Sequence, residues 1–323
     1  MTILVTGAAG FIGSHLCRCL LDRGDEVVGI DDLNDYYDPA LKEGRLDLLR
    51  SRNGFSFFKG DISKPEALLN AVRGRRIVRV VHLAAQAGVR YSLENPRAYV
   101  RSNLSGHLEI LELCRSLETV EHLVYASSSS VYGGNEKVPF SETDSVDHPV
   151  SLYAATKKAD ELMSHAYAHL YGIPQTGLRF FTVYGPWGRP DMAYWLFTEA
   201  MLKGQPIRVF NNGDMWRDFT YVDDIVSGTV AALDHVPAGE GVPHRVYNIG
   251  HNKPERLGTF IDMLEDILGV KAIRRYEPMQ PGDVPQTFAD ISAIERDLGF
   301  TPKVGLREGL TLFADWYRGY FKV

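Results

Sequence analysis

The stretch ILVTGAAGFIGSH, residues 3–15, places three glycines after a short apolar run and before a helical pattern. The apolar run is typical of a buried strand. Gly7, Gly10 and Gly13 allow a tight turn, close approach of the backbone to a pyrophosphate, and close packing of helix on strand. Their spacing is G-x-x-G-x-x-G rather than the commoner G-x-G-x-x-G. The stretch therefore predicts a dinucleotide-binding unit at the start of the chain.

Short β-branched runs alternate with helical patterns through the first half of the chain. The runs that indicate strands are ILVTG (3–7), EVVGIDD (26–32), FSFFKGDI (55–62), RVVHLAAQ (79–86), HLVYASS (122–128) and TGLRFFTVYG (176–185). The spacing of apolar residues predicts helices over 13–23, 66–73, 97–117 and 153–171. This alternation indicates an α/β fold with a doubly wound parallel (Rossmann) sheet.

The alternation loosens from about Gly185, where the turn clusters GPWGRPD, FNNGD and QPGDVPQ occur. We expect a smaller C-terminal α/β substrate-binding domain there, over the carboxyl edge of the sheet, where open α/β sheets bind ligands. The predicted division assigns residues 1–180 to the Rossmann domain and residues 181–323 mainly to the second domain. Segments near 211–248 and 284–292 are expected to return to the Rossmann domain.

The composition is that of an ordinary globular chain. Its 323 residues are 45% apolar and carry 35 Lys and Arg against 41 Asp and Glu, a net charge of -6. That balance argues against the basic face that nucleic-acid binding needs, and no apolar run reaches membrane-spanning length. Three cysteines without metal-ligand spacing, and no secretory signal, predict a cytoplasmic protein. The ten histidines show no ligand spacing, so we expect no metal site and interpret His82 as a core residue.

Acidic residues at the ends of two predicted strands extend the dinucleotide site. The second run ends in Asp31-Asp32, near the distance at which an acid accepts hydrogen bonds from adenosine ribose hydroxyls. No basic residue follows before Lys42, which favours NAD over NADP. Asp61 in KGDIS is a candidate for the adenine edge, although an acid at such a place is often a helix N-cap.

Tyr153 and Lys157 in YAATK are four residues apart in a predicted helix, so both side chains lie on one face. A tyrosine with the ordinary pKa of about 10 is a poor base at neutral pH until a nearby cation favours the phenolate. The lysine and an oxidised nicotinamide would supply that charge. The serine run 127–130 adds hydroxyl donors, and the combination is what oxidation of an alcohol requires.

Six motifs resemble those of the extended short-chain dehydrogenase/reductase family, in the branch that modifies nucleotide sugars. They are GAAGFIG, HLAAQ, SSSSVYG, Tyr153-x-x-x-Lys157, LRFFTVYGP and RDFTYVDD. Within this branch, FTVYGPWGRPDMA, FNNGDMWRDFTYVDDIV and QPGDVPQTFAD are similar to segments of UDP-glucuronate 4-epimerases. The resemblance covers essentially the whole chain. It implies 4-epimerisation of UDP-glucuronate to UDP-galacturonate by transient oxidation at carbon 4, rotation of the 4-keto intermediate and re-reduction on its opposite face.

The resemblance also implies a role for each matching residue. Tyr153 would take the proton of the sugar's 4-hydroxyl, Lys157 would be its electrostatic partner and a ligand of the nicotinamide ribose, and Ser128 would donate to the 4-oxygen. The implied NAD-binding residues are Gly7, Gly10, Phe11, Ile12, Gly13, Asp31, Asn34, Asp61, Ile62, Ala84, Ala85, Tyr153 and Lys157. NAD is then regenerated in each turnover and behaves as a bound group.

Ser129 and Ser130 bear on rival reactions. Dehydratases of this family carry Asp-Glu at these positions and decarboxylases keep a glutamate, whereas a serine hydroxyl does not serve as a base. Thr182 stands where UDP-glucose 4-epimerases place asparagine. We hypothesise that Ser129, Ser130 and Thr182 hydrogen-bond the carboxylate of UDP-glucuronate and hold it away from the geometry of decarboxylation. The alternative is that the two serines satisfy backbone groups in a turn.

The resemblance assigns charged residues to the nucleotide. Arg217 in WRDFTYVDD resembles the arginine that grips the UDP diphosphate, and Arg189 in GRPDM is a second candidate. Asp283 in QPGD matches the carboxylate that binds the uridine ribose, but Gln280 stands where UDP-glucose 4-epimerases have an arginine. Arg90 is either a contact for anionic groups of the substrate or part of a structural ion pair.

Three alternatives stay open beside the UDP-glucuronate 4-epimerase interpretation: a UDP-glucose 4-epimerase, a UDP-glucuronate decarboxylase, and an idle NAD-binding or regulatory module. Thr182 argues against the first, the absent glutamate against the second, and the intact Ser128, Tyr153 and Lys157 set against the third. In this family the long helices over 97–117 and 153–171 would pack against their copies in a second subunit. The resemblance therefore implies an isologous homodimer.

Overall fold

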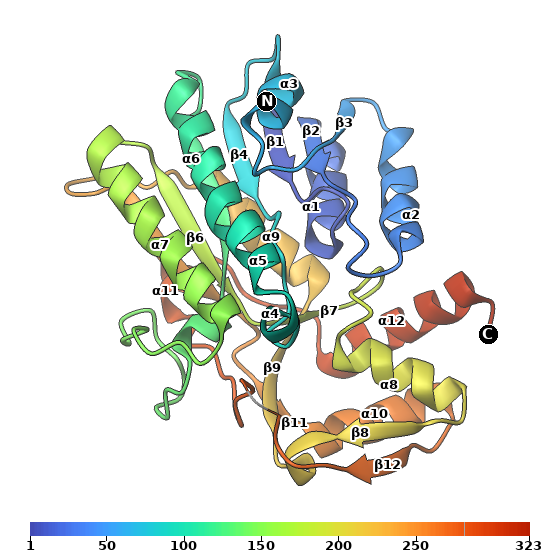
Figure 1. Ribbon diagram of the computed structural model, residues 1–323. Helices are drawn as coiled ribbons and strands as arrows, with labels where there is room; N and C mark the ends of the chain where they lie inside the picture. Colours follow the sequence, from blue (N-terminus) through green and yellow to red (C-terminus); the bar gives the residue numbers. More distant parts are fainter. Residues whose placement is uncertain (281) are drawn as a thin grey trace.

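The computed structural model describes residues 1–280 and 282–323, and in these residues seven parallel strands form the central sheet (Figure 1). The strands are β1 (Thr2–Thr6), β2 (Glu26–Asp31), β3 (Phe55–Lys59), β4 (Arg79–His82), β5 (His122–Ser128), β6 (Gln175–Phe180) and β10 (His244–Ile249). Their order is β10-β6-β5-β4-β1-β2-β3. The order in which successive strands are added to the sheet changes sides between β1 and β4, and ligands of open α/β sheets bind at such a switch point. The predicted Rossmann sheet is confirmed.

The central strands are apolar on both faces because helices cover both sides of the sheet. In β1, Ile3 and Val5 belong to the core under α1 (Phe11–Asp22), whereas Leu4 between them belongs to the core under α6 (Gly106–Ser116). Successive side chains of a strand point to opposite faces, so a strand buried on both sides carries a continuous apolar run. The run ILV in the opening stretch is therefore a structural requirement of the layered fold.

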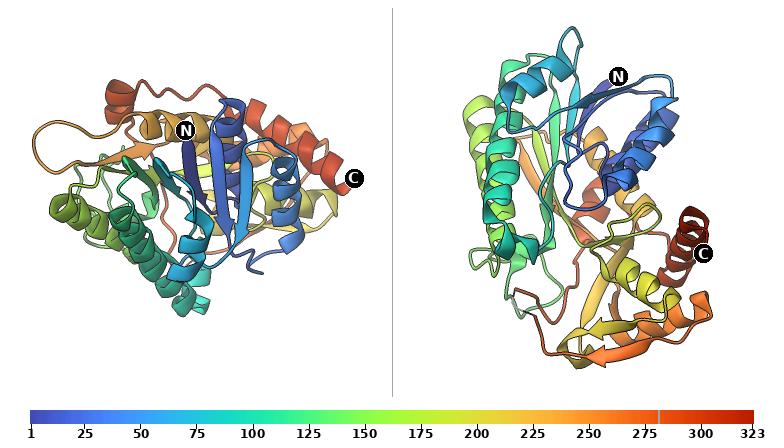
Figure 2. Two further views of the ribbon diagram at one scale, coloured as in Figure 1. Left: turned by 90° about the horizontal axis from the view of Figure 1, so that it is seen from above. Right: turned by 45° about the vertical axis from the view of Figure 1, so that its right-hand side comes forward.

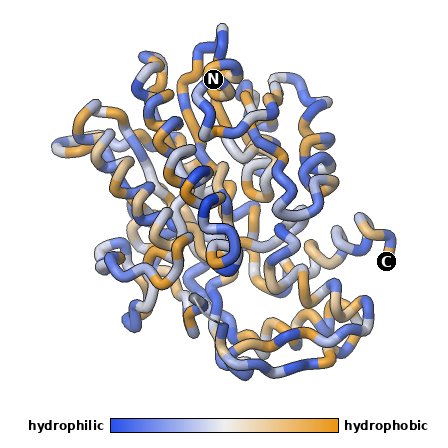
Figure 3. Tube along the Cα trace, in the orientation of Figure 1, coloured by the Kyte–Doolittle hydropathy of each residue, from blue (hydrophilic) through white to orange (hydrophobic). Residues whose placement is uncertain are grey.

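Helices lie on both sides of the sheet (Figure 2). One layer consists of α3 (Pro65–Val72), α4 (Tyr91–Glu94), α5 (Pro96–Tyr99), α6 and α7 (Leu152–Tyr171); the other includes α1, α2 (Pro39–Arg50), α9 (Val222–Asp234) and α11 (Ser292–Leu298). Along α6 and α7, hydrophobic and hydrophilic residues alternate with the helical period (Figure 3). Helix α7 begins where the Ser151 hydroxyl accepts a hydrogen bond from the Ala154 N–H, and it ends at Gly172, which is left-handed with φ of 65°.

The helix predicted over 97–117 is not one regular helix. It consists of α5, a π-helical segment η1 (Val100–Ser105) and then α6. A π-turn inserts one extra residue into the helix and changes the direction of the side chains that follow, and such turns are frequent at functional sites. Apolar spacing alone does not show this change, because the residues on either side keep their helical pattern.

The C-terminal part lies below the carboxyl edge of the sheet in Figure 1. Its strands are β7 (Thr182–Tyr184), β8 (Pro206–Val209), β9 (Trp216–Tyr221), β11 (Pro254–Arg256) and β12 (Ile273–Tyr276), and its helices are α8 (Ala193–Leu202), α10 (Leu257–Leu268) and α12 (Leu306–Phe321). Two short 3₁₀ turns are η2 (Ser129–Tyr132) and η3 (Phe210–Gly213). Strand β10 pairs with β6 in the central sheet, and α9 packs against α1. The division at residue 180 stays a prediction.

Four further features bear on the interpretation of the chain. Among residues 1–280 and 282–323, no helix combines the length and the apolar character needed to cross a membrane, and no group of three or more His, Cys, Asp or Glu could hold a metal ion. Cys17, Cys19 and Cys114 are free thiols. His82 is buried and its Nδ1 is 2.8 Å from the Thr6 hydroxyl, as expected for a core residue.

Candidate active site

A cavity of about 810 Å³ opens at the carboxyl edge of the central sheet. Its walls include every residue that the sequence predicts for NAD, for catalysis and for the substrate. These residues are Gly7, Gly10, Phe11, Ile12, Gly13, Asp31, Asn34, Asp61, Ile62, Ala84, Ala85, Arg90, Ser128, Ser129, Ser130, Tyr153, Lys157, Thr182, Arg189, Arg217 and Asp283. Parallel strands end at one edge, so residues from distant parts of the sequence meet there. Their individual roles stay predictions.

The glycines form a cradle that fits a dinucleotide. Gly7 has φ of +72°, and a Cβ at this position would stand 2.8 Å from the backbone nitrogen of Ala84. A Cβ at Gly13 would stand 2.0 Å from the carbonyl oxygen of Gly7, so only glycine lets α1 pack this closely on the loop. The loop leads into the N-terminus of α1, whose free N–H groups and dipole attract a phosphate.

Asp31 lies at the end of β2, and each of its two carboxylate oxygens accepts one hydrogen bond from the backbone. It accepts hydrogen bonds from the N–H of Ala9 at 3.2 Å and of Leu33 at 2.9 Å. Burial raises the pKa of Asp31, while the nearby Lys42 ammonium acts in the opposite direction. Lys42 also lines the cavity, where its Nζ donates to the side chain of Asn34 at 3.0 Å. Lys42, the first basic residue after Asp31 and Asp32, therefore lies in the site. Its distance from them in the sequence did not indicate this.

Asp61 lines the cavity but also closes a local turn. Its Oδ1 accepts hydrogen bonds from the backbone N–H and the hydroxyl of Ser63, at 2.9 and 2.8 Å. Its second oxygen is 3.8 Å from Arg101 Nε. The helix N-cap alternative for Asp61 is wrong, because α3 begins after Lys64; Asp61 instead closes the turn before that helix with one oxygen, and the other stays available to a ligand.

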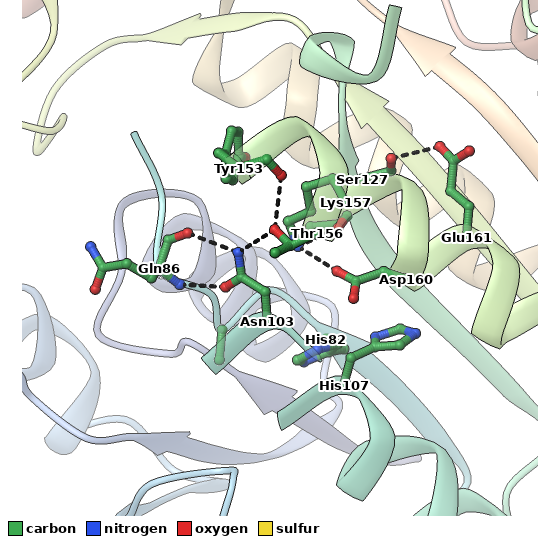
Figure 4. A network of polar contacts seen from close by, with 12 residues as sticks. His82, Gln86, Asn103, His107, Ser127, Tyr153, Thr156, Lys157, Asp160 and Glu161 are labelled. Carbon is green, nitrogen blue, oxygen red and sulfur yellow. Dashed lines mark hydrogen bonds and ion pairs between the residues drawn. The ribbon is translucent and has the colours of Figure 1, made fainter. Parts of the chain in front are cut away.

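Tyr153 and Lys157 occupy the first two turns of α7, beside the end of β5. Tyr153 is half-buried and Lys157 is 3% exposed. Lys157 Nζ donates to the carbonyl of Ala126 at 2.9 Å and to the carboxylate of Asp160 at 3.1 Å (Figure 4). An ammonium has three N–H donors, so one remains for a ligand in the cavity. This arrangement fixes a cation one helical turn after Tyr153 on α7.

The serine run turns out of β5 into η2. Strand β5 ends at Ser128, whose Oγ accepts a hydrogen bond from the backbone N–H of Ser130 at 3.1 Å. The turn is thus closed by Ser128 rather than by Ser129 or Ser130. Within the described residues the hydroxyls of Ser129 and Ser130 make no hydrogen bond, and together with Thr182 they face the cavity as donors that a ligand could use.

Asn103 does not line the cavity but supports Gln86, which does, and sequence reasoning missed it. It lies in the π-helical segment η1, is 1% exposed, and donates to the carbonyl of Gln86 at 3.1 Å and to the Thr156 hydroxyl at 2.9 Å (Figure 4). Its side-chain oxygen accepts from the Gln86 N–H at 2.8 Å. Asn103 therefore ties the loop after β4 to the helix of Tyr153. The π-turn that orients the Asn103 side chain cannot be predicted from the pattern of apolar residues.

Arg217 and Asp283, both predicted to bind the nucleotide, form an ion pair with each other. Arg217 Nη2 is 2.9 Å from Asp283 Oδ1, and Arg90 Nη2 approaches Asp283 Oδ2 at 3.5 Å. Arg90 also stacks on the ring of Phe210. Burial lowers the pKa of Arg217, against the attraction of Asp283. One carboxylate thus holds two guanidinium groups at the cavity wall, and of the two interpretations offered for Arg90 an ion pair is present.

Arg189 lines the same cavity in a second charged group. Its Nε donates to Asp191 at 3.0 Å, and the hydroxyl of Tyr36 donates to the same carboxylate at 3.1 Å. Burial acts to raise the pKa of Asp191, but the Arg189 guanidinium and the hydrogen bond from Tyr36 together lower it below its ordinary value. Gln280, where relatives carry an arginine, is absent from the cavity walls among the described residues.

Comparison with known proteins agrees with this geometry. Residues 3–250 match the NAD dependent epimerase/dehydratase family. A UDP-glucuronate 4-epimerase of Arabidopsis thaliana is 50% identical over 99% of this chain and 76% of its own length. The UDP-glucuronic acid 4-epimerase of Bacillus cereus, solved with UDP-glucuronic acid and NAD, is 38% identical with a TM-score of 0.89, over 99% of this chain and 100% of that one.

A UDP-glucose 4-epimerase of Thermotoga maritima, solved with UDP-glucose, shares the fold at the same TM-score of 0.89 but is 32% identical, over 99% of this chain and 100% of its own. The fold alone therefore does not separate the two epimerases, whereas the identity favours the first. With a family match over 248 residues, from 3 to 250, and relatives aligned along nearly its whole length, the chain belongs to the NAD dependent epimerase/dehydratase family.

Proposed function

We propose that the protein is an NAD-containing UDP-glucuronate 4-epimerase. The observation that carries the proposal is one cavity in which a dinucleotide cradle, the Tyr153 and Lys157 pair and three free hydroxyls share a wall. The hydroxyls of Ser129 and Ser130 stand where a base for elimination or decarboxylation would be needed, and Thr182 stands where UDP-glucose 4-epimerases place asparagine. The UDP-glucuronate 4-epimerases of Arabidopsis thaliana and Bacillus cereus support the same reaction.

The residues divide the chemistry between them. Bound NAD supplies a hydride acceptor and donor for carbon 4. Tyr153 Oη takes the proton of the 4-hydroxyl and returns it when the sugar is reduced. Lys157 holds the charge that favours the phenolate, and Ser128 Oγ donates to the 4-oxygen. Gly7, Gly10 and Gly13 position the pyrophosphate, and Arg217 or Arg189 would bind the UDP phosphates.

The three hydroxyls would control the fate of the oxidised sugar. Oxidation of UDP-glucuronate at carbon 4 produces a β-keto acid, which loses carbon dioxide when its carboxylate can align with the carbonyl. Hydrogen bonds from Ser129, Ser130 and Thr182 would hold the carboxylate out of that alignment. The same contacts would select a uronate over glucose, because the hydroxyls would lack their partner in a complex with UDP-glucose.

We expect Ser130→Ala to release a UDP-pentose by-product and to raise the KM for UDP-glucuronate several-fold, because one carboxylate contact is worth about 1–2 kcal/mol. Products are separated by ion-pair chromatography. Ser116→Ala, at a hydroxyl outside the cavity that donates to the Leu113 carbonyl, is the control. Epimer formed at the wild-type rate with unchanged KM and no pentose would contradict a role of Ser130 in holding the carboxylate.

The direct test of the function is proton NMR of the purified protein with UDP-glucuronate and no added NAD. Appearance of UDP-galacturonate supports the proposal. Formation of a UDP-pentose, or no change in the substrate, refutes it. UDP-glucose is the second substrate, and its conversion at a higher kcat/KM than that of UDP-glucuronate would favour the alternative epimerase.

We also propose an isologous homodimer built on α6 and α7, which lie side by side (Figure 1). Their outer surface exposes Leu108 by 39%, Leu162 by 59% and Leu170 by 65%. Apolar patches of this kind mark protein interfaces. Light scattering should give twice the chain mass for the wild type and a lower mass for Leu162→Lys, and a monomeric wild type would contradict the proposal.

A cytoplasmic location is part of the same proposal. Cys17, Cys19 and Cys114 are free thiols, and burial raises the pKa of each. Thiols persist in a reducing compartment.

A further inference from the structure

A buried carboxylate lies beside the candidate catalytic lysine. Asp160 follows Lys157 by three residues on α7 and its side chain is 0% exposed. Its Oδ2 accepts the Lys157 ammonium at 3.1 Å (Figure 4). Among the residues that the structure describes, its other oxygen, Oδ1, has no hydrogen-bond partner. A buried carboxylate with an unpaired oxygen destabilises a fold, so packing does not explain its presence.

Charged and titratable groups from six elements surround this pair. They are Tyr153 and Glu161 on α7, His82 on β4, His107 on α6, Tyr125 on β5, Arg179 on β6 and His244 on β10. Burial lowers the pKa of His82 well below its ordinary value and that of His107 to about 3, so both rings are neutral.

The other charges near the pair are already compensated. Glu161 pairs with Arg179 at 2.8 Å and also accepts from the Ser127 hydroxyl. Burial lowers the pKa of His244 to about 4, and Tyr125 is held neutral because burial raises its pKa. Within the described residues, Glu161 is thus neutralised by Arg179, whereas Asp160 is the acid that pairs with the Lys157 ammonium.

The geometry gives Asp160 two effects on Lys157. First, Asp160 and the Ala126 carbonyl accept two of the three ammonium hydrogens, which orients the third. Second, a negative charge 3.1 Å from the ammonium weakens the field that the ammonium exerts on any anion nearby. A phenolate at Tyr153 is such an anion, so Asp160 opposes its formation while keeping the ammonium in place.

We propose that Asp160 is a positioning residue of the reaction, which orients the Lys157 ammonium and sets how strongly that ammonium favours the Tyr153 phenolate. The inference rests on the proposed function, because it assigns Tyr153 the part of the base. Burial raises the pKa of Asp160 to about 6, against the attraction of Lys157. Asp160 therefore gains a proton as the pH falls from 7 to 5, and its restraint on the phenolate is removed there.

The variant Asp160→Asn separates charge from hydrogen bonding, since its amide oxygen still accepts from Lys157. Without the negative charge of Asp160, the Tyr153 phenolate is favoured. We therefore expect the acid limb of the pH profile of kcat/KM to shift to lower pH by about one unit. Asp160→Ala removes the acceptor as well. We expect it to lower the plateau kcat about 10- to 100-fold with little change in KM, because the ammonium is no longer oriented.

A second readout does not depend on turnover. Ultraviolet difference absorbance of the NAD-loaded protein, with Tyr153→Phe as the blank, follows the ionisation of Tyr153. Its midpoint should move to lower pH in Asp160→Asn and in Asp160→Ala, so that either variant tests the charge if the other fails to fold. Should UDP-glucuronate not be converted at all, the proposed function fails, and the absorbance titration still decides the effect of Asp160.

The matched control is Asp224→Asn, which removes another buried carboxylate, one that accepts the N–H groups of Lys303 and Val304 at 3.0 Å. We expect it to lower thermal stability and to leave both pH dependences unchanged. An acid limb and an absorbance midpoint that stay at the wild-type pH in the Asp160 variants would overturn the proposal. So would a shift of equal size in Asp224→Asn.

Discussion

Replacement of Tyr153 by phenylalanine is expected to slow epimerisation by about 10²- to 10⁴-fold, the usual contribution of a positioned acid or base. The ring stays and only the hydroxyl is lost, so the fold and the NAD content should match those of the wild type. The rate is measured by NMR with UDP-glucuronate, and bound NAD by chromatography after denaturation. The loss should fall on kcat rather than on KM, because the proton moves only during the chemical step.

Tyr167→Phe is the matched control for this prediction. Tyr167 lies on the same helix, α7, but its hydroxyl donates to Glu112 on α6, outside the cavity. We expect near wild-type turnover from it. A Tyr153→Phe enzyme that keeps more than about a tenth of the wild-type kcat would show that another group moves the proton.

Gly13→Ala should abolish the dinucleotide site. A methyl group at this position would stand 2.0 Å from the carbonyl oxygen of Gly7, a backbone atom that moves only if helix α1 separates from the loop. Overpacking of this kind costs about 1–3 kcal/mol, and the separation also displaces the N–H groups that would hold the pyrophosphate. We expect a large loss of bound NAD and a lower urea midpoint.

Gly319→Ala provides the comparison, since this glycine lies in α12 with no atom within 4 Å of an added Cβ. Alanine is favoured over glycine in a helix by about 1 kcal/mol, so this variant should keep its NAD and be slightly more stable. If Gly13→Ala retained a full complement of NAD and the wild-type urea midpoint, the glycine loop would not be the cofactor cradle.

Local pattern was sufficient for much of the fold and for the outline of the site. Strands β1 to β6 and helices α1, α3 and α7 follow from apolar periodicity, whereas strand β10 of the central sheet was not predicted. Helix α7 has the polar N-cap Ser151 and the left-handed Gly172 at its ends. Tyr153 and Lys157 could be paired because a separation of four residues fixes their relation on any helix. When two residues are close in the sequence, the number of residues between them determines their relative positions in a helix or turn.

Contacts between distant segments could not be obtained in this way. Lys42 reaches the end of β2 because α2 folds back over the loop, and Asn103 reaches Thr156 because a π-turn redirects it. The ion pair of Arg217 with Asp283 joins residues 66 positions apart. None of these has a periodic signature, since each depends on the path of the chain between the two groups.

Periodicity and short-range spacing were enough to predict the doubly wound sheet, the glycine loop and the placement of Tyr153 and Lys157 on one helix face, because these patterns specify helices, strands and turns. The catalytic roles of the two residues stay predictions. Only the tertiary structure decided that Asp160 faces Lys157 with one oxygen unpaired, and that Ser128 rather than Ser129 or Ser130 closes the turn. The electrostatics of a site depend on burial and on what surrounds each charge. Those quantities exist only once the sheet, α6 and α7 have packed together.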